Sequence, residues 1–481
     1  MSQPDSARLG RLRESLPHPI VDGDGHLVEF MPAVRDELVG LAGEDMAKQF
    51  DAIFDTGRLI RDLDVETRRA LGLFRMSWWA FPTANTLDRA TALLPGLMAE
   101  RLPELGIDFA ILYPTLGLTV PHLDDPDLRR AACRAFNRYY AEACRPYSER
   151  ITPAAVIPMH SPQEAVEEID YATEILGMRV IALSGYVARP LRGAGEMRAA
   201  RWIDSFGPDD PTAYDAVWSH CLTRGITPTF HSSAMGWGSR VSQTNYMSNH
   251  IGNFAVAGEA TCRSLFLAGV PQRFPDLPFA FLEGGVGWGA NLYSDLIGHY
   301  EKRGGSAVNQ FDPSHIDHPR MADLMTEYGS KAFTRNIDRL EGALRILSDP
   351  DEDPETRDEF RHCGAEGTSG IRRVFSDRFF FGCEADDPMN ALAFNPSLNP
   401  LGTRLRAVFS SDIGHWDVPD MGDVLLEAWE LVENQQLSEA DFRDFTFANA
   451  VDLFSLTNPN FFDGTAVEDA ARKEIAAAPT R

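Results

Sequence analysis

The chain has 481 residues, 44% of them hydrophobic, and 71 Asp and Glu against 45 Lys and Arg give it a formal net charge of −26. Such an acidic protein repels nucleic acid and anionic membrane surfaces, so neither is expected as a partner. Six cysteines occur without a CxxC pair, and no apolar run reaches the roughly 18 residues of a membrane span, which favours a reduced, cytoplasmic protein without a signal peptide.

The first predicted strand, His18–Asp24, ends in an unusual group of acids, glycines and a histidine. The sequence there reads Asp-Gly-Asp-Gly-His. Side chains alternate along a strand, so Asp22, Asp24 and His26 are expected on one face. The glycines would let the backbone pass close to a bound ion, although Asp and Gly are also common in ordinary turns.

Seven further apolar segments are predicted to be strands, and helical segments separate them. They are Asp108–Pro114, Ile151–Met159, Met178–Gly185, Ile226–Ser232, Phe279–Gly285, Phe379–Glu384 and Ala407–Asp412. Nearly continuous apolar strands that alternate with helices indicate a parallel sheet. Eight such units predict an α/β fold of the (β/α)8 TIM-barrel type, with a doubly wound open sheet as the alternative.

The spacing of these elements predicts one large domain with insertions. We expect an N-terminal arm over 1–17, a single barrel over 18–457 and a C-terminal tail over 458–481. The connections after the first and sixth strands are too long for single helices. They predict a mostly helical cap at about 31–105 and a lid at about 288–375.

Acids and histidines collect where the predicted strands end, which is the rim where a barrel of this kind carries its active site. Besides Asp24 and His26, they are His231, Glu283, Glu384, Asp412, His415 and Asp417. Imidazole together with carboxylate is the ligand mixture for Zn, Mn or Fe. Taken singly, His231 could be a hydrogen-bonded core residue, Asp412 a helix cap and Glu283 the partner of an arginine. Their joint position favours a metal site.

Four sequence motifs give the chain a family resemblance that covers about residues 18–457. They are "IVDGDGH", "AGVPQRFPDLPFAFLEGGVGW", "FSSDIGHWD" and "NAVDLFSL". They resemble the first strand, the sixth-strand region, the end of the eighth strand and the closing helix of the amidohydrolase superfamily. The similar branch is the amidohydrolase-related one, which includes aminocarboxymuconate-semialdehyde decarboxylase and resorcylate decarboxylases.

The resemblance implies a set of site residues. Asp24, His26 and His231 would be metal ligands, and Asp412 would be a ligand or the general base. Three departures concern the reaction more than the fold. Asp24 stands where hydrolases usually have a histidine. The fourth strand, "VIALSG", offers no lysine for the carbamate that bridges two ions, so one divalent ion is favoured over two. Glu283 stands where relatives often place a histidine, and it or His250 would bind or protonate the leaving group.

Several functions remain open at this stage. The leading hypothesis is a metal-dependent hydrolase of a small organic substrate that uses a metal-activated water. The alternative is metal-dependent, non-oxidative decarboxylation of an aromatic or unsaturated carboxylic acid. An iron- or manganese-dependent oxygenase and a barrel subunit without catalysis are further possibilities. A homodimer is expected, and the roles of Glu29, Glu384, His415 and Asp417 are open.

Overall fold

Eight parallel strands form the central sheet of the molecule, in the order β1-β2-β3-β4-β7-β8-β9-β10. The computed structural model describes residues 3–75, 84–191, 201–232, 241–344 and 356–477. The strands are β1 Val21–Leu27, β2 Phe109–Pro114, β3 Ile151–Val156, β4 Val180–Leu183, β7 Pro228–Phe230, β8 Phe279–Phe281, β9 Phe379–Glu384 and β10 Arg406–Ser410. Nearly all of their residues are buried. This burial is expected, because helices cover the outer face of each strand and side chains pack inside the barrel.

The sheet closes on itself between its first and last strands. The backbone N–H of His26 donates to the carbonyl of Ile413 (2.9 Å), and that of Asp412 donates to the carbonyl of Asp24 (3.1 Å). The ring of strands with helices outside it is a (β/α)8 barrel, so this prediction is confirmed and the open doubly wound sheet is wrong.

The first strand differs most from its prediction. It runs over Val21–Leu27, so Asp24 and His26 lie inside the strand instead of at and beyond its end. The register against β2 shifts between Asp22 and Gly25, and this irregularity breaks the strict alternation of side chains.

The glycines of β1 make room for neighbouring strands. A Cβ at Gly23 would lie 2.5 Å from Cγ1 of Val408 in β10, and one at Gly25 would lie 3.0 Å from Cδ2 of Leu112 in β2. Close packing against protein atoms therefore explains why these two positions are glycine. A bound ion is not required to explain them.

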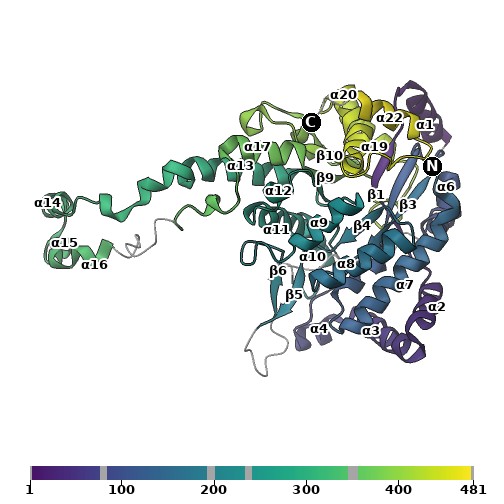
Figure 1. Cartoon of the computed structure of the whole chain (residues 1–481), viewed down its shortest axis with the longest axis horizontal. Helices are drawn as coiled ribbons and strands as arrows, with labels where there is room; N and C mark the ends of the chain where they lie inside the picture. Colours follow the sequence, from purple (N-terminus) through teal and green to yellow (C-terminus); the bar gives the residue numbers. More distant parts are fainter. Residues whose placement is uncertain (1–2, 76–83, 192–200, 233–240, 345–355, 478–481) are drawn as a thin grey trace.

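Helices surround the barrel (Figure 1). Those that connect or follow the strands include α7 Pro126–Cys144, α8 Pro162–Asp170, α9 Asp215–Arg224, α10 Tyr246–His250, α11 Asn253–Leu267, α12 Val270–Arg273, α13 Gly287–Arg303, α17 Gly367–Asp377, α18 Ala391–Phe394, α19 Val424–Glu433, α20 Glu439–Arg443, α21 Asn449–Ser455 and α22 Glu468–Ala477. Helix α1 Gln3–Ser15 precedes the barrel and buries Leu9 and Leu12.

Two connections carry most of the additional structure. Between β1 and β2 lie α2 Met31–Ala42, α3 Glu44–Asp62, α4 Val65–Leu71, α5 Thr86–Leu93 and α6 Pro95–Arg101. Between β8 and β9, an arm with α14 His318–Tyr328, α15 Lys331–Thr334 and α16 Leu340–Leu344 extends away from the barrel (Figure 1). A short antiparallel pair, β5 Val187–Pro190 and β6 Arg201–Asp204, follows β4.

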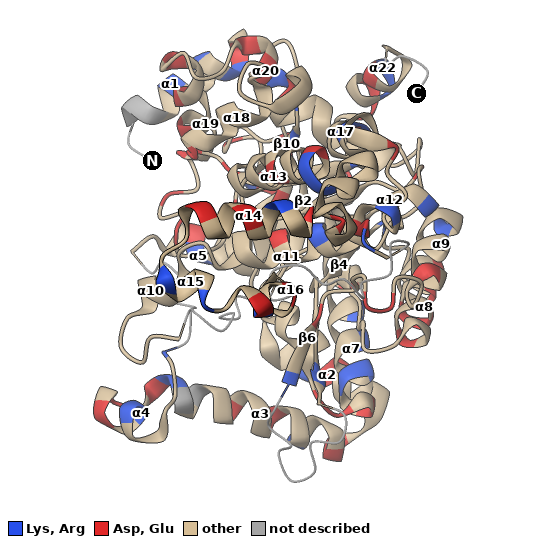
Figure 2. Ribbon diagram, turned by 90° about the vertical axis from the view of Figure 1, so that its left-hand side faces the viewer, with Lys and Arg blue, Asp and Glu red and all other residues tan. Residues whose placement is uncertain are grey.

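The charge of the surface and the state of the cysteines agree with what the composition predicts. Figure 2 shows acidic residues spread over the outer helices, with basic residues among them. All six cysteines are buried free thiols. Within the described part of the chain, no helix combines the length and the apolar character that crossing a membrane requires.

Candidate active site

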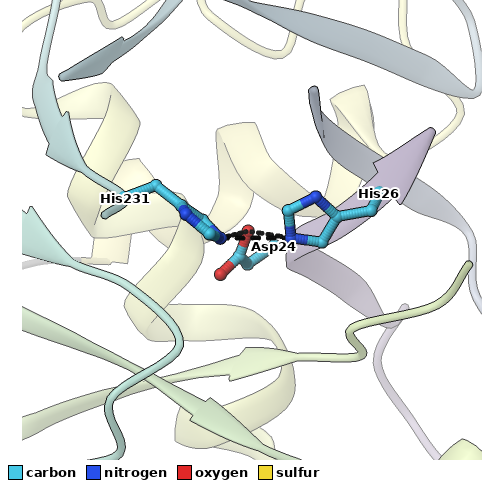
Figure 3. Close-up of side chains that lie close together, drawn as sticks. All are labelled: Asp24, His26 and His231. Atoms are coloured by element: carbon cyan, nitrogen blue, oxygen red, sulfur yellow. Dashed lines mark hydrogen bonds and ion pairs between the residues drawn. The ribbon is translucent and has the colours of Figure 1, made fainter. Parts of the chain in front are cut away.

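Four side chains meet at the carboxyl end of the barrel strands. Asp24 and His26 come from β1, His231 follows β7 and Asp412 follows β10. Nε2 of His26 lies 3.1 Å from Nε2 of His231, and 3.6 Å from Oδ1 of both Asp24 and Asp412. Figure 3 shows Asp24, His26 and His231 pointing at one another. All four residues are 0–4% exposed, so the group is shielded from solvent.

Backbone carbonyls determine which nitrogen each imidazole presents. Nδ1 of His26 lies 3.2 Å from the carbonyl oxygen of Pro114, and Nδ1 of His231 lies 3.0 Å from that of Ser232. A carbonyl oxygen only accepts, so in both rings Nδ1 is the donor. The two Nε2 atoms of the neutral rings then carry lone pairs that face each other, which is the tautomer that binds a metal.

The charge state of the group fits a cation at its centre. Burial, with smaller contributions from His415 and His231, lowers the pKa of His26, and burial also lowers the pKa of His231. Burial raises the pKa of Asp24, and both of its carboxylate oxygens are buried without a hydrogen-bond donor. Within the described residues, Asp24–His26–His231 is one of two groups whose ligand atoms lie close enough together to hold an ion.

The second group contains two residues that follow the last strand, β10, in place of Asp24 and His231. It consists of His26, Asp412 and His415. Nδ1 of His415 lies 2.6 Å from Oδ1 of Asp412, and its ring stacks on that of His26 with centroids 3.8 Å apart. On its other side, Nε2 of His415 lies 3.0 Å from Oγ1 of Thr115. The Asp-x-x-His spacing in the sequence, Asp412 to His415, is the signal for this contact.

Two of the site residues have a strained backbone. Asp412 has φ +49° and Glu283 has φ +57°, in the left-handed region that residues with a Cβ seldom adopt. Such strain persists where the surrounding structure holds a side chain in a functional position. It aims both carboxyl groups at the same group of histidines.

Glu283 connects this group to a cavity of about 340 Å³. Its Oε2 lies 2.7 Å from Nε2 of His231. Burial, followed by the neighbouring charges of Asp417 and Glu384, raises the pKa of the Glu283 carboxyl well above its usual range. A buried acid therefore stands between the possible ligands and the open space beside them.

The other predicted residues of this rim line that cavity. His250, at the end of α10, contacts Trp416 with ring centroids 5.3 Å apart and Phe254 at 5.9 Å. Glu384 and Asp417 line the same space. The structure thus brings His250 to the cavity wall, and Phe254 also contacts His231, with ring centroids 5.8 Å apart.

Two acids of the first strand region have other partners. Asp22 accepts from the N–H and the hydroxyl of Ser411, the latter at 2.5 Å. Glu29 is 4% exposed and accepts from three successive N–H groups, those of Thr115, Leu116 and Gly117. Both carboxylates stabilise the backbone near the site by accepting hydrogen bonds from its N–H groups.

Comparison with known proteins identifies the family. A family model described as an amidohydrolase matches residues 88–329, which is just over half of the chain. No curated protein sequence matches the chain.

Several solved structures are similar to this one. An amidohydrolase from Mycobacterium avium subsp. paratuberculosis K-10 has 20% identity and a TM-score of 0.46, with 76% of each chain covered. A 2,6-dihydroxybenzoate decarboxylase from Rhizobium has 17% identity and a TM-score of 0.44, covering 91% of this chain and 99% of its own. A 5-carboxyvanillate decarboxylase from Sphingomonas paucimobilis has 13% identity and a TM-score of 0.46, covering 91% and 98%.

Proposed function

Because the chain belongs to the amidohydrolase family, we propose that it is a metal-dependent enzyme that removes carbon dioxide from a small aromatic or unsaturated carboxylic acid. The observation that carries the proposal is the pair of inward-facing imidazole lone pairs, set between carboxylates at the edge of a cavity. Decarboxylation becomes the leading reaction here, and hydrolysis becomes the alternative that the test distinguishes from it.

One divalent ion would be held by Asp24, His26, His231 and Asp412. Histidine with carboxylate suits manganese, zinc or iron, and β4, with the sequence Val-Ile-Ala-Leu, supplies no lysine for a second ion. When bound, the ion would act as a Lewis acid on an oxygen of the substrate. His415 and Thr115 would hold Asp412 in its orientation through the contacts of 2.6 and 3.0 Å.

The cavity walls suit a planar substrate. The aromatic rings of His250, Phe254 and Trp416 line it, and its volume of about 340 Å³ is near the lower end of ordinary small-molecule sites. A ring of benzoate size would pack between these side chains with its carboxyl group toward Asp24 and His26.

Glu283 would supply the proton. Its raised pKa favours the protonated form of the carboxyl group, which lies next to His231 and lines the cavity. When the bond between the ring carbon and the carboxylate breaks, the electron pair remains on the carbon. The proton of Glu283 would replace the carboxylate there, carbon dioxide would leave, and solvent would return a proton to Glu283.

The test uses the protein loaded with Mn²⁺ and a panel of hydroxybenzoic and aminobenzoic acids. We expect carbon dioxide release, and in deuterated water one deuterium at the vacated carbon. Glu283→Gln should lower kcat by about 100-fold and leave the metal content unchanged. His231→Ala should lose both metal and activity.

A parallel panel of esters, amides and lactones tests hydrolysis in water enriched in oxygen-18. Incorporation of the label into the product, without release of carbon dioxide from any acid, would replace decarboxylation by the hydrolytic alternative. Full activity in both Glu283→Gln and His231→Ala would reject this site for either reaction.

A further inference from the structure

The cavity beside the candidate metal site has an unusually acidic lining. Glu283 follows β8, Glu384 ends β9, Asp387 follows it, and Asp417 lies beyond β10. Four carboxyl groups from three strand ends therefore share about 340 Å³. No lysine or arginine belongs to the described residues that line this space. Arg75 influences the pKa of nearby Tyr246 but is not among the lining residues.

The carboxyl groups act on one another. The side chain of Glu384 is exposed at the end of β9. Desolvation by the surrounding protein, followed by the charges of Asp417, Asp386 and Asp387, raises the pKa of Glu384 to about 7. Like charges so placed oppose ionisation, and a cation between them would relieve the repulsion.

Asn253 indicates a polar ligand in the same space. It is the first residue of α11, it lines the cavity and it is fully buried. Among the described residues, neither its side-chain oxygen nor its side-chain nitrogen has a hydrogen-bond partner. Leaving a buried amide without partners is energetically costly, so native structures normally satisfy such a group through a ligand or water.

Aromatic rings complete the wall. Trp416 and His250 lie edge to face, with centroids 5.3 Å apart, and both line the cavity. Aromatic faces attract cations and also pack on planar groups. Carboxylates, an amide oxygen and aromatic rings are together the features that recognise a planar or tetrahedral nitrogen cation.

We propose that the end of the substrate remote from the metal carries a cationic nitrogen group, such as an ammonium or amidinium. Glu384 and Asp387 pair with its charge, and the side-chain oxygen of Asn253 accepts one of its N–H groups. This inference rests on the proposed function only in placing the substrate in this cavity. It defines the substrate class as amino- or amidino-substituted acids and excludes those with a second anionic group.

The test measures binding of three probes of nearly equal size to the Mn²⁺-loaded protein by titration calorimetry. Benzamidine is cationic, benzamide is neutral and benzoate is anionic. We expect benzamidine to bind about tenfold more tightly than benzamide in low salt, and added NaCl to reduce this difference. Glu384→Gln and Asp387→Asn should each remove most of the difference, and binding of benzamide should change little.

Asp386→Asn is the matched control, because it removes an equal exposed charge beside Asp387 but outside the cavity lining. Its affinity for benzamidine should stay within about twofold of that of the unaltered protein. Thermal melts confirm that each variant is folded.

Two results would overturn the inference: benzamidine binding no better than benzamide, or tight benzamidine binding that both cavity variants leave intact. Because binding is the readout, selective capture of benzamidine by a protein that decarboxylates nothing would support the cavity inference and reject the proposed function. Decarboxylation of a dicarboxylic acid, with no preference for amino-substituted acids, would support the proposed function and reject the cavity inference.

Discussion

The contacts of single atoms determine how the residues of the candidate site are oriented and protonated. His26 and His231 each donate from Nδ1 to a backbone carbonyl, and this leaves Nε2 as the nitrogen that faces the candidate metal position. Asp412 is held in a left-handed backbone conformation, with His415 against its Oδ1 and Thr115 behind His415. The exact chemistry of the site therefore depends on side chains that would not themselves touch the substrate.

Thr115→Val tests this support. The change removes the hydroxyl that contacts Nε2 of His415 and keeps the side-chain shape, so kcat should fall about tenfold with little change in KM. Thr115→Ser keeps the hydroxyl and should retain most of the activity. Metal analysis and steady-state kinetics check both variants. A Val variant as active as the Ser variant would show that His415 needs no such support.

His18 lies at the opposite end of the barrel from the site and predicts a pH dependence of stability. Burial, followed by the charges of Arg443 and Arg13, lowers its pKa to about 4. Below pH 6.5 the unfolded chain takes up this proton and the folded chain does not, until the pH approaches 4. The contribution of His18 is therefore complete above pH 6.5 and is lost as the pH falls toward 4.

Denaturant unfolding of the protein and of His18→Gln measures that loss. Between pH 7 and pH 4.5, the protein should lose about 2 kcal/mol more unfolding free energy than the variant. Other buried histidines contribute equally to both curves, so the difference isolates His18. Parallel curves would contradict the prediction.

At the scale of elements, packing between one helix and one strand holds the acidic wall of the cavity in place. Helix α13 begins four residues after Glu283 and lies against β9, whose last residue is Glu384. A Cβ added at Gly289 of α13 would lie 2.4 Å from Cε1 of Phe381 in β9, far inside contact distance. The absent side chain lets the helix approach the strand.

Gly289→Ala should lower the free energy of unfolding by about 1–3 kcal/mol, because overpacking outweighs the gain in helix propensity. Gly298→Ala lies in the same helix with no atom within 4 Å of the added Cβ. It should raise stability by about 0.5–1 kcal/mol, the ordinary gain of alanine over glycine. Equal effects of the two changes, measured by denaturant unfolding, would show that α13 can shift away from β9 without cost.

For the whole molecule, the candidate site joins distant parts of the chain. Asp24 and His26 lie in the first strand and Asp412 follows the last, next to the hydrogen bonds that close the barrel. An ion held by these residues would bind the folded chain and not the unfolded one. Its binding free energy would therefore add to the stability of the closed barrel.

Added Mn²⁺ at 100 times its Kd should raise the free energy of unfolding by about 2.7 kcal/mol, and chelation should remove that gain. His231→Ala should show no such response. His299→Ala, which removes an exposed histidine of α13, should respond like the unaltered protein. Melting curves with and without the ion check this, and an equal response of all three proteins would place the ion elsewhere.

The sequence by itself determined the architecture and the candidate residues. Apolar runs such as Phe379–Glu384 had to be buried strands, and alternation with helices made the sheet parallel. Parallel strands place all their carboxyl ends at one rim, so His231 and Asp412 could be expected there together from position alone. These are local rules of burial and periodicity that each segment obeys separately.

Only the tertiary structure decided the rest. The shift within β1 depends on how Gly23 and Gly25 meet neighbouring strands, and the roles of Glu29 and His415 depend on contacts with Thr115. The acidic cavity and the unpaired amide of Asn253 arise where three strand ends and one helix start converge. Contacts between residues up to hundreds of positions apart are set by the closure of the ring, and no local pattern encodes them.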